Sequence, residues 1–494
     1  MSKAFYLFFV LLIINASKCY IVLPVQLLPK ENYKSEYDLN TPKDIMSKEF
    51  ISSYYTELEV GIPSQTIPIL IKQKTNDYII TSINPLENPK RDYTSKKLIY
   101  DFSEIFLEKY CYYNESKSNT KGLGQCEERT PLDEIEKPAA EVVCGSNETI
   151  LLYNNIDLKE KAKYNNFYFD LAKNSKDNVT GVIGLGLNDA YFHKSFLSVL
   201  KSNNLIDNFF WFFEFDSWDS TSGKLILGAV LDNIYSDKYS NDDLVPTHSG
   251  DAMYVYWDMN FDEIYIKKEN DKIKFINNRE KAELNVESNL IIGNKEYKKY
   301  LLIILDQFMN EKCFNDTFKG YDEMFDYDAT INFYYCKNEK NVKDKLYSSI
   351  STIYFNSIDL NTSFELTKEQ ILKENNEYIF INIVFSENLD RWILGKQIAL
   401  KYKFMLNPET KNIYYYPSMS SMGKNEPEKT NYLKIILICA LLVIVCVIGI
   451  IIGKLLYGKS KKRRANELKD DNYEYFPEEN KDKDNKIITG NDDE

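Results

Sequence analysis

The chain has 494 residues and a formal net charge of −13 at pH 7, and its aromatic content of 14% favours strands over helices. Such an acidic chain repels phosphate backbones, so we expect no nucleic-acid partner. Its two histidines, His193 and His248, nearly exclude a catalytic or metal centre built on several histidines. We therefore expect no metal and no cofactor.

Residues 1–19 have the pattern of a secretory signal peptide. Lys3 supplies the positive charge, residues 4–14 are apolar, and small or polar residues follow up to Cys19. We expect cleavage after Cys19, and an uncleaved anchor is the alternative. Residues 20–50 then form an N-terminal arm or a pro-like segment.

The region from residue 51 to residue 417 has the pattern of a mostly β protein. Apolar runs rich in β-branched and aromatic residues predict strands at residues 53–60, 66–71, 78–80, 224–228, 261–266, 378–385 and 412–416. Short helices are predicted at residues 195–202, 295–310 and 367–373.

A weak internal repeat divides this region. Residues 69–80 share a pattern with residues 282–293, and each copy is followed downstream by an apolar segment that contains glycine. Two equivalent halves predict two lobes, residues 51–240 and 241–417, with a cleft between them.

The C-terminal part contains a second long apolar run. Residues 418–432 predict a flexible stalk, and residues 433–457 are long and apolar enough to span a bilayer. A basic cluster follows the run, and positive charge stays in the cytosol, so residues 20–432 are expected in the lumen or outside the cell. The chain is therefore predicted to be a single-pass type I membrane protein of the secretory pathway or plasma membrane.

The tail, residues 458–494, is charged and poor in apolar residues, so it is predicted to be disordered and cytosolic. Within it, Tyr473 and Phe476 fit a tyrosine-based sorting signal that a coat adaptor would read. The alternative is an ordinary disordered segment.

Cysteines and glycosylation sequons bear on the topology. Cys313 and Cys336 form a natural disulfide pair, and Cys111 with Cys126 is a second predicted pair. Cys144 is then left over, either as a free thiol or paired differently. Sequons for N-glycosylation lie on the same side of the predicted span, at Asn114, Asn147, Asn178, Asn315 and Asn361.

Five segments, in order, resemble signatures of the pepsin-like aspartic proteases. They are residues 54–66 (YYTELEVGIPSQT), 181–186 (GVIGLG), 223–228 (GKLILG), 256–264 (YWDMNFDEI) and 391–395 (RWILG). The resemblance implies an all-β, bilobal fold with few short helices. It also implies a substrate cleft between the lobes and a disulfide in the second lobe, where Cys313 and Cys336 lie.

The resemblance locates the two loops that carry catalysis in this family. Each lobe there contributes an Asp-Thr-Gly or Asp-Ser-Gly loop, and the two aspartates activate a water molecule. Neither triplet occurs in this chain, and the flanking residues align Lys72 and Asn285 with the aspartates. Neither residue brings a carboxylate, so the dyad is degenerate and we expect no catalytic residues. The predicted cleft residues are Lys72, Gln73, Lys74, Asn285, Val286 and Glu287.

Other family features also differ. Lys396 stands where the family usually has aspartate, and Val142 aligns with the tyrosine of the hairpin that closes over substrate. Gln73 replaces a threonine whose hydroxyl links the two loops. Lys72 or Lys74 is predicted to pair with Glu287 in place of that link. The alternative is that these side chains point into solvent in an opened cleft.

These features predict a membrane-anchored, inactive aspartic-protease-like protein. Its ectodomain is expected to bind a protein or peptide at the cell surface or in a secretory organelle, with a coat adaptor as a further partner of the tail. The alternatives are an active aspartic endopeptidase with an atypical site and a sorting receptor for luminal cargo.

Overall fold

The structure is a computed structural model, and it describes the chain in separate stretches. These are residues 19–28, 41–50, 53–73, 78–81, 113–129, 141–173, 180–187, 195–217, 220–240, 244–248, 256–268, 271–276, 279–305, 312–322, 327–350, 352–358, 360–389 and 391–416. The predicted signal peptide up to residue 18, and the predicted stalk, span and tail with Tyr473 and Phe476, lie outside them. No helix in the described stretches is long and apolar enough to cross a membrane.

Strands make up most of the described residues. They are β1 (Ile21–Leu27), β2 (Tyr54–Val60), β3 (Gln65–Lys72), β4 (Tyr78–Thr81), β5 (Gly122–Arg129), β6 (Glu141–Tyr153), β7 (Lys161–Lys173), β8 (Gly181–Gly184), β9 (Trp211–Glu214), β10 (Ser222–Leu227), β11 (Val245–His248), β12 (Asp258–Phe261), β13 (Glu263–Lys268), β14 (Asp271–Ile276), β15 (Glu280–Leu284), β16 (Ile291–Asn294), β17 (Cys313–Asp322), β18 (Tyr327–Lys337), β19 (Thr352–Ser357), β20 (Thr362–Thr367), β21 (Leu372–Glu374), β22 (Tyr378–Ser386), β23 (Trp392–Leu394), β24 (Met405–Asn407) and β25 (Asn412–Tyr415).

The helices are short. They are α2 (Pro42–Phe50), η1 (Glu115–Lys117), α4 (Phe196–Ser202), α5 (Leu231–Ile234), η3 (Lys295–Tyr297), α6 (Lys298–Leu305), α7 (Lys340–Ser349), α8 (Lys368–Ile371) and α9 (Lys396–Lys401). The mostly β class with few short helices is therefore confirmed, and it is consistent with a bilobal pepsin-like fold.

Two predicted elements need correction. The strand predicted at residues 261–266 is the end of β12 and the start of β13, which pair with different neighbours. The helix predicted at residues 367–373 is only the single turn α8, because Leu372 leaves it to pair with Ile381 of β22. Helices α2, α7 and α9 were not predicted.

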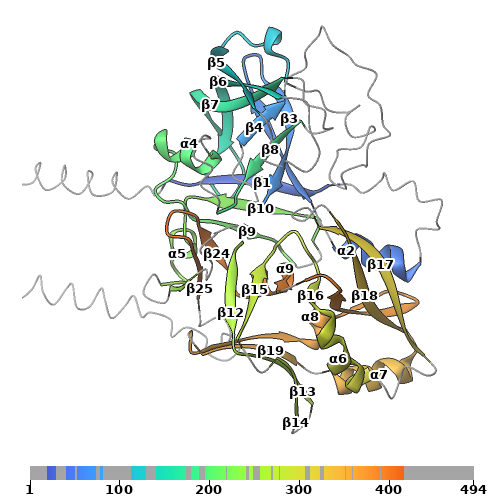
Figure 1. Ribbon diagram of the computed structural model, residues 1–494. Coiled ribbons are helices and arrows are strands. Elements are labelled where there is room, and N and C mark those ends of the chain that lie inside the picture. The colour runs from blue at the N-terminus through green and yellow to red at the C-terminus, as the bar shows by residue number, and fades with distance from the viewer. Residues whose placement is uncertain are drawn as a thin grey trace, which may run out of the picture. The chain divides into compact units, whose positions relative to one another are not determined.

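The internal repeat corresponds to a repeated strand arrangement. In the first copy, β3 pairs parallel with β8, β8 pairs antiparallel with β4, and β4 pairs parallel with β7. In the second copy, β15 pairs parallel with β23, β23 antiparallel with β16, and β16 parallel with β22. Figure 1 shows β3, β8 and β4 together in one group and β15 and β16 in another. Each copy therefore brings the end of its first strand beside an apolar strand, which contains Gly184 in β8 and is followed by Gly395 in β23.

The sheet of the first copy recruits strands from both ends of the described chain. Its order is β11-β25-β24-β9-β10-β1-β2-β3-β8-β4-β7-β6-β5. Strand β1, from the predicted arm, lies between β10 and β2, and β24 and β25 come from beyond residue 400. The arm is thus part of the central sheet.

Buried aromatic residues join the parts of this architecture. Trp211 of β9 packs edge-to-face against Trp257, with ring centroids 5.9 Å apart, and both side chains are buried. In the second copy, Cys313 of β17 and Cys336 of β18 are joined by the predicted disulfide. A continuous core therefore supports the two loops that the sequence analysis singled out.

Candidate functional site

The first residues of the two aligned triplets occupy equivalent places in the repeat. Lys72 ends β3 opposite Gly184 of β8, and its carbonyl accepts a hydrogen bond from Leu185 at 2.8 Å. In the second copy, Leu284 ends β15 opposite Leu394, and the next residue, Asn285, donates its N–H to Leu394 at 2.9 Å. Ile71, opposite Ile183 of β8, corresponds to Leu284, and the strand pairing is therefore consistent with the alignment of Lys72 with Asn285.

Gln73 joins the two loops through both ends of its side-chain amide. Its Oε1 accepts from the N–H of Val286 at 2.9 Å, and its Nε2 donates to the carbonyl of Leu284 at 2.5 Å. Its backbone N–H donates to Oε1 of Glu287 at 3.1 Å. Because Gln73 and Glu287 are buried, these bonds are protected from water. We call these contacts the Gln73 bridge.

Asn285 directs its side chain to its own loop. Its Oδ1 accepts from the N–H of Glu287 at 2.9 Å, a bond from residue i+2 that asparagine commonly forms in turns. The side chain is buried, and an amide oxygen is a poor base. The contact orders the loop and positions Glu287 toward Gln73.

These contacts test the expectation that the side chains of the two loops point into solvent. The expectation that the side chains point into solvent is wrong for Gln73, Asn285, Val286 and Glu287, which are all buried. A lysine partner for Glu287 stays a prediction, and Lys74 lies outside the described residues. Gln73 was not predicted to be the link, although its amide has both the donor and the acceptor that a two-way link needs.

Lys396 places a buried cation beside the second loop. Its backbone N–H donates to Ser288 at 2.7 Å, and its Nζ donates to the carbonyl of Ser220 at 2.9 Å. The same Nζ lies 3.8 Å from the ring centre of Phe215 and 5.4 Å from that of Tyr54. Aromatic faces and a carbonyl therefore stabilise a cation where the family usually has an acid.

The alignment of Val142 with the tyrosine of a closing hairpin stays a prediction. Val142 lies within a ladder, opposite Glu128 of β5 and Lys173 of β7. The connection between β5 and β6, residues 130–140, lies outside the described residues.

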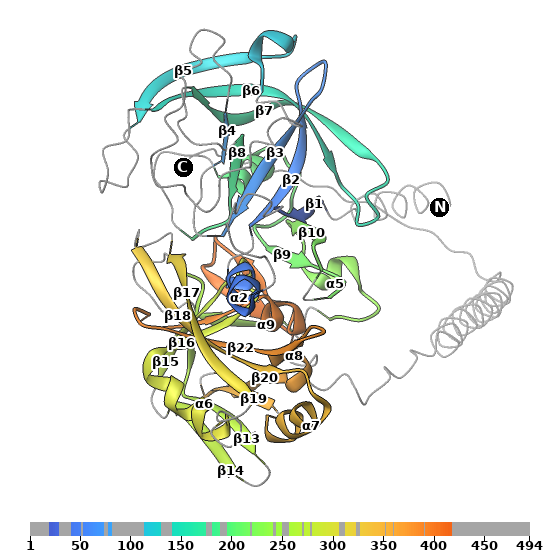
Figure 2. The same ribbon diagram turned by 90° about the vertical axis from the view of Figure 1, so that its right-hand side faces the viewer.

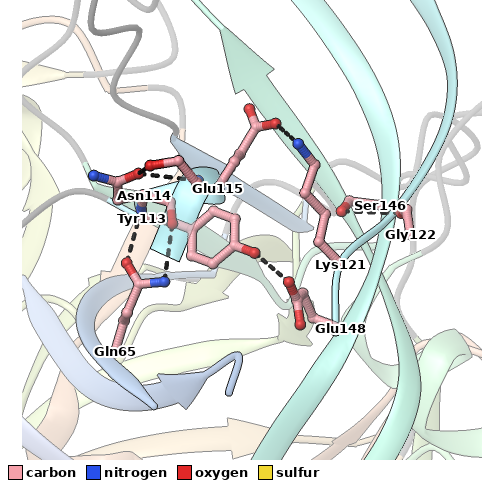
Figure 3. A network of polar contacts seen from close by, with 9 residues as sticks. Gln65, Tyr113, Asn114, Glu115, Lys121, Gly122, Ser146 and Glu148 are labelled. Carbon is pink, nitrogen blue, oxygen red and sulfur yellow. Dashed lines mark hydrogen bonds and ion pairs between the residues drawn. The ribbon is translucent and has the colours of Figure 1, made fainter. Parts of the chain in front are cut away.

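A second polar network holds the segment before β5 (Figure 3). Gln65 of β3 clamps the backbone of Asn114, donating through Nε2 at 3.0 Å and accepting through Oε1 at 2.8 Å. The buried Tyr113 hydroxyl donates to Glu148 of β6, and Thr120 donates to the other carboxylate oxygen at 2.6 Å. Burial, and then the Glu148 carboxylate, raise the pKa of Tyr113. This neutral hydroxyl supports structure and supplies no nucleophile.

The predicted modification sites fall in different surroundings. Asn147, Asn315 and Asn361 are exposed, whereas Asn114 is half-buried and its Oδ1 accepts from the hydroxyl of Ser116 at 2.7 Å. Asn178 lies outside the described residues. The exposed asparagines are accessible to the glycosylation machinery.

Cys144 is disulfide-bonded, so the free-thiol alternative for this residue is wrong. The backbone register places Cys126 of β5 directly opposite Cys144 of β6. The other half of the predicted pair, Cys111, lies outside the described residues. The predicted Cys111–Cys126 bridge stays a prediction.

Within the described stretches, no group of three or more histidine, cysteine, aspartate or glutamate residues is placed to hold a metal ion. The polar groups at the loop junction are instead engaged with one another through the Gln73 bridge.

Comparison with known proteins gives one distant similarity that agrees with this architecture. The chain is 27% identical over 202 residues to barrierpepsin of Saccharomyces cerevisiae, a pepsin-family aspartic protease. The aligned region covers 37% of this chain and 32% of barrierpepsin, so the chain spans about a third of that relative. No protein-family profile matches the sequence. The similarity supports a relationship to the pepsin-like proteins.

Proposed function

We propose that this chain is a pepsin-like protein without peptidase activity, whose ectodomain binds a protein or peptide partner. The observation that carries the proposal is the Gln73 bridge. It links the two loops through a glutamine amide and Glu287, at the junction where the family relies on paired aspartates. A junction built this way is suited to holding the loops together.

The chemistry of the dyad supports this proposal. Two carboxylates must face each other, so that one takes a proton from water while the other donates one. Lys72 offers an ammonium without an acceptor, and Asn285 offers a neutral amide oxygen that already accepts from Glu287. Glu287 brings a carboxylate, but Gln73 donates to it from the other loop. Each missing acid or base removes about 10²- to 10⁴-fold of rate.

Retention of the surrounding fold supports a binding role. The repeated strand arrangement and the buried core around both loops are intact, although the chemistry at their tips differs. We further propose that residues 433–457 anchor the protein as a type I membrane protein at the cell surface or in a secretory organelle. The exposure of Asn147, Asn315 and Asn361 supports a glycosylated, luminal ectodomain.

A peptidase assay tests the proposal directly. The full-length protein, purified in detergent, is incubated with a complex peptide library from acid to neutral pH, with and without a pepstatin-type inhibitor. Lys72→Ala and Asn285→Ala variants are controls, and an active pepsin-like enzyme verifies the assay. We expect no cleavage and no inhibitor binding. Cleavage that the inhibitor blocks would overturn the proposal and support the alternative of an active endopeptidase.

A further inference from the structure

Helix α2 of the arm is anchored on the second repeat by few side chains. Thr41 begins it by accepting from the N–H of Asp44 at 3.3 Å, and Pro42 occupies the first helical position, which suits proline. Met46 and Phe50 are buried, one turn apart on the same side of the helix. A nine-residue helix is marginal by itself, so α2 depends on the surface that it covers.

That surface is an apolar face built by β16, β17, β18, β22 and β23. We call it the α2 face, and it consists of Leu290, Ile292, Phe318, Ala329, Ile331, Phe333, Phe380, Val384, Leu389 and Ile393. Phe50 meets Phe318 edge-to-face, with ring centroids 5.5 Å apart. Figures 1 and 2 both show α2 beside β17 and β18.

A polar anchor fixes the end of α2 against the second loop. The carboxylate of Glu49 accepts from Nδ2 of Asn289 at 2.9 Å and from Nζ of Lys373 at 2.7 Å. The carbonyl of Glu49 also accepts from the N–H of Asn289 at 3.1 Å. Asn289 follows Glu287 of the Gln73 bridge by two positions. Asn289 and Lys373, beside the α2 face, therefore bind an acid next to an apolar anchor.

The aromatic surface continues beyond α2. Phe333 stacks on Tyr335 with ring centroids 5.8 Å apart, and Tyr335 contacts Phe314 at 5.4 Å and Tyr378 at 5.4 Å. Tyr335 and Tyr378 are only partly buried, and Phe314 is 37% exposed. These residues lie on β17, β18 and β22, the strands that form the α2 face. Beside the α2 face, Phe314, Tyr335 and Tyr378 therefore offer aromatic surface that stays partly exposed.

We propose that the α2 face is the docking site for an amphipathic, acidic helix of a partner protein, and that α2 is its internal occupant. The inference rests on the proposed binding function and specifies its ligand. The partner helix carries two apolar residues four positions apart, with a glutamate directly before the second, as Met46, Glu49 and Phe50 do. It displaces α2 by repeating these contacts and covering Phe314 and Tyr335 as well.

The covalent connection of α2 to the chain determines how tightly a partner helix must bind to displace α2. A segment held by a short flexible connection acts at an effective concentration of about millimolar. A free helix that made only the contacts of α2 would therefore compete poorly at micromolar concentration. The uncovered aromatic rings provide the additional contact area that favours the partner.

Binding of a labelled peptide tests the inference. The probe has the sequence of residues 41–52, with a lactam bridge on its exposed side to hold the helix. Fluorescence anisotropy measures its binding to the full-length protein carrying Phe50→Ala, or Met46→Ser with Phe50→Ser. Lys43→Ser, on the exposed side of α2, is the matched control. We expect saturable binding to the anchor variants, and at least tenfold weaker binding to the wild type and to Lys43→Ser.

Exchanging the charges of residues 49 and 373 tests whether the probe binds where α2 binds. A probe carrying Glu49→Lys should bind the anchor variants at least about tenfold more weakly, because it loses charged hydrogen bonds to Asn289 and Lys373. Adding Lys373→Glu to the protein should restore part of that loss. The milder Phe50→Ala variant, checked by its thermal unfolding, guards against misfolding. Absence of probe binding to this folded variant would overturn the inference alone, whereas peptidase activity would overturn the proposed function.

Discussion

Gln73 performs with one side chain what the family achieves with paired hydroxyl groups. Its amide donates to Leu284 and accepts from Val286, and both partners belong to the other loop. The sequence showed that Gln73 stands in place of the threonine, but it did not show that Gln73 makes the link, because partners more than 200 positions apart leave no local pattern.

Gln73→Ala should lower the free energy of unfolding by about 2–4 kcal/mol, because it leaves the N–H of Val286 and the carbonyl of Leu284 buried without their partner. Urea denaturation followed by fluorescence measures the change. Gln65→Ala is the control, since Gln65 also clamps a backbone through both amide atoms but is only half-buried. Equal effects of the two substitutions would contradict a special role for the junction.

At the scale of elements, the predicted strands lie close to their expected bounds, although many strands, β5, β6 and β7 among them, were not predicted. Strands β2, β3, β4, β10, β22 and β25 carry dense β-branched and aromatic runs, and each was found within a residue or two of its predicted bounds. Helix α2 escaped prediction because Met46 and Phe50 alone give no apolar stripe. The helix at α8 was predicted to be too long. Pairing with Ile381 of β22 stabilises Leu372 more than another helical turn would.

The stability of the β13–β14 hairpin is expected to depend on pH through Glu263. Glu263 of β13 accepts from Lys274 at 2.5 Å and from Asn356 of β19 at 3.1 Å. The hydrogen bond from Lys274, and then the charge of Lys272, lower the pKa of Glu263, although partial burial opposes them. A lowered folded-state pKa adds stability above the unfolded pKa and loses it as pH falls through the folded value.

The wild type should therefore lose stability in acid, below the ordinary glutamate pKa of 4.5, more steeply than Glu263→Gln does. Thermal unfolding between pH 3 and pH 7 measures the difference. Glu339→Gln is the control, because Glu339 pairs with Lys312 at an exposed site. Parallel pH profiles for wild type and Glu263→Gln would show that the carboxylate adds nothing.

At the scale of the whole molecule, the sequence predicted the duplication but not the exchange of strands between its parts. The repeated pattern at residues 69–80 and 282–293 corresponds to two equal strand arrangements. However, β1, β24 and β25 join one sheet across the predicted lobe boundaries. Such pairings join residues that are distant in sequence, and periodicity within a window cannot detect them.

The place of β1 predicts that the arm is retained in the mature protein. Ile21, Val22, Leu23 and Val25 are buried between β10 and β2. Burying each such side chain contributes about 1.5–3 kcal/mol, so their sum is comparable with the stability of a typical domain. Mass spectrometry of the deglycosylated protein should find Tyr20 near the N-terminus. A folded protein that begins after residue 28 would contradict this expectation.

Lys396 and the Gln73 bridge together bear on how reversible the evolution of this chain is. Two substitutions, Lys72→Asp and Asn285→Asp, would restore the family's acids in name. They would leave a buried cation above Phe215 and a glutamine spanning the loops, both adapted to the present arrangement. Either substitution alone would add a carboxylate to a junction whose polar groups already bond one another through the Gln73 bridge. If the proposed function holds, single mutations at this junction would therefore not create a working pair of acids.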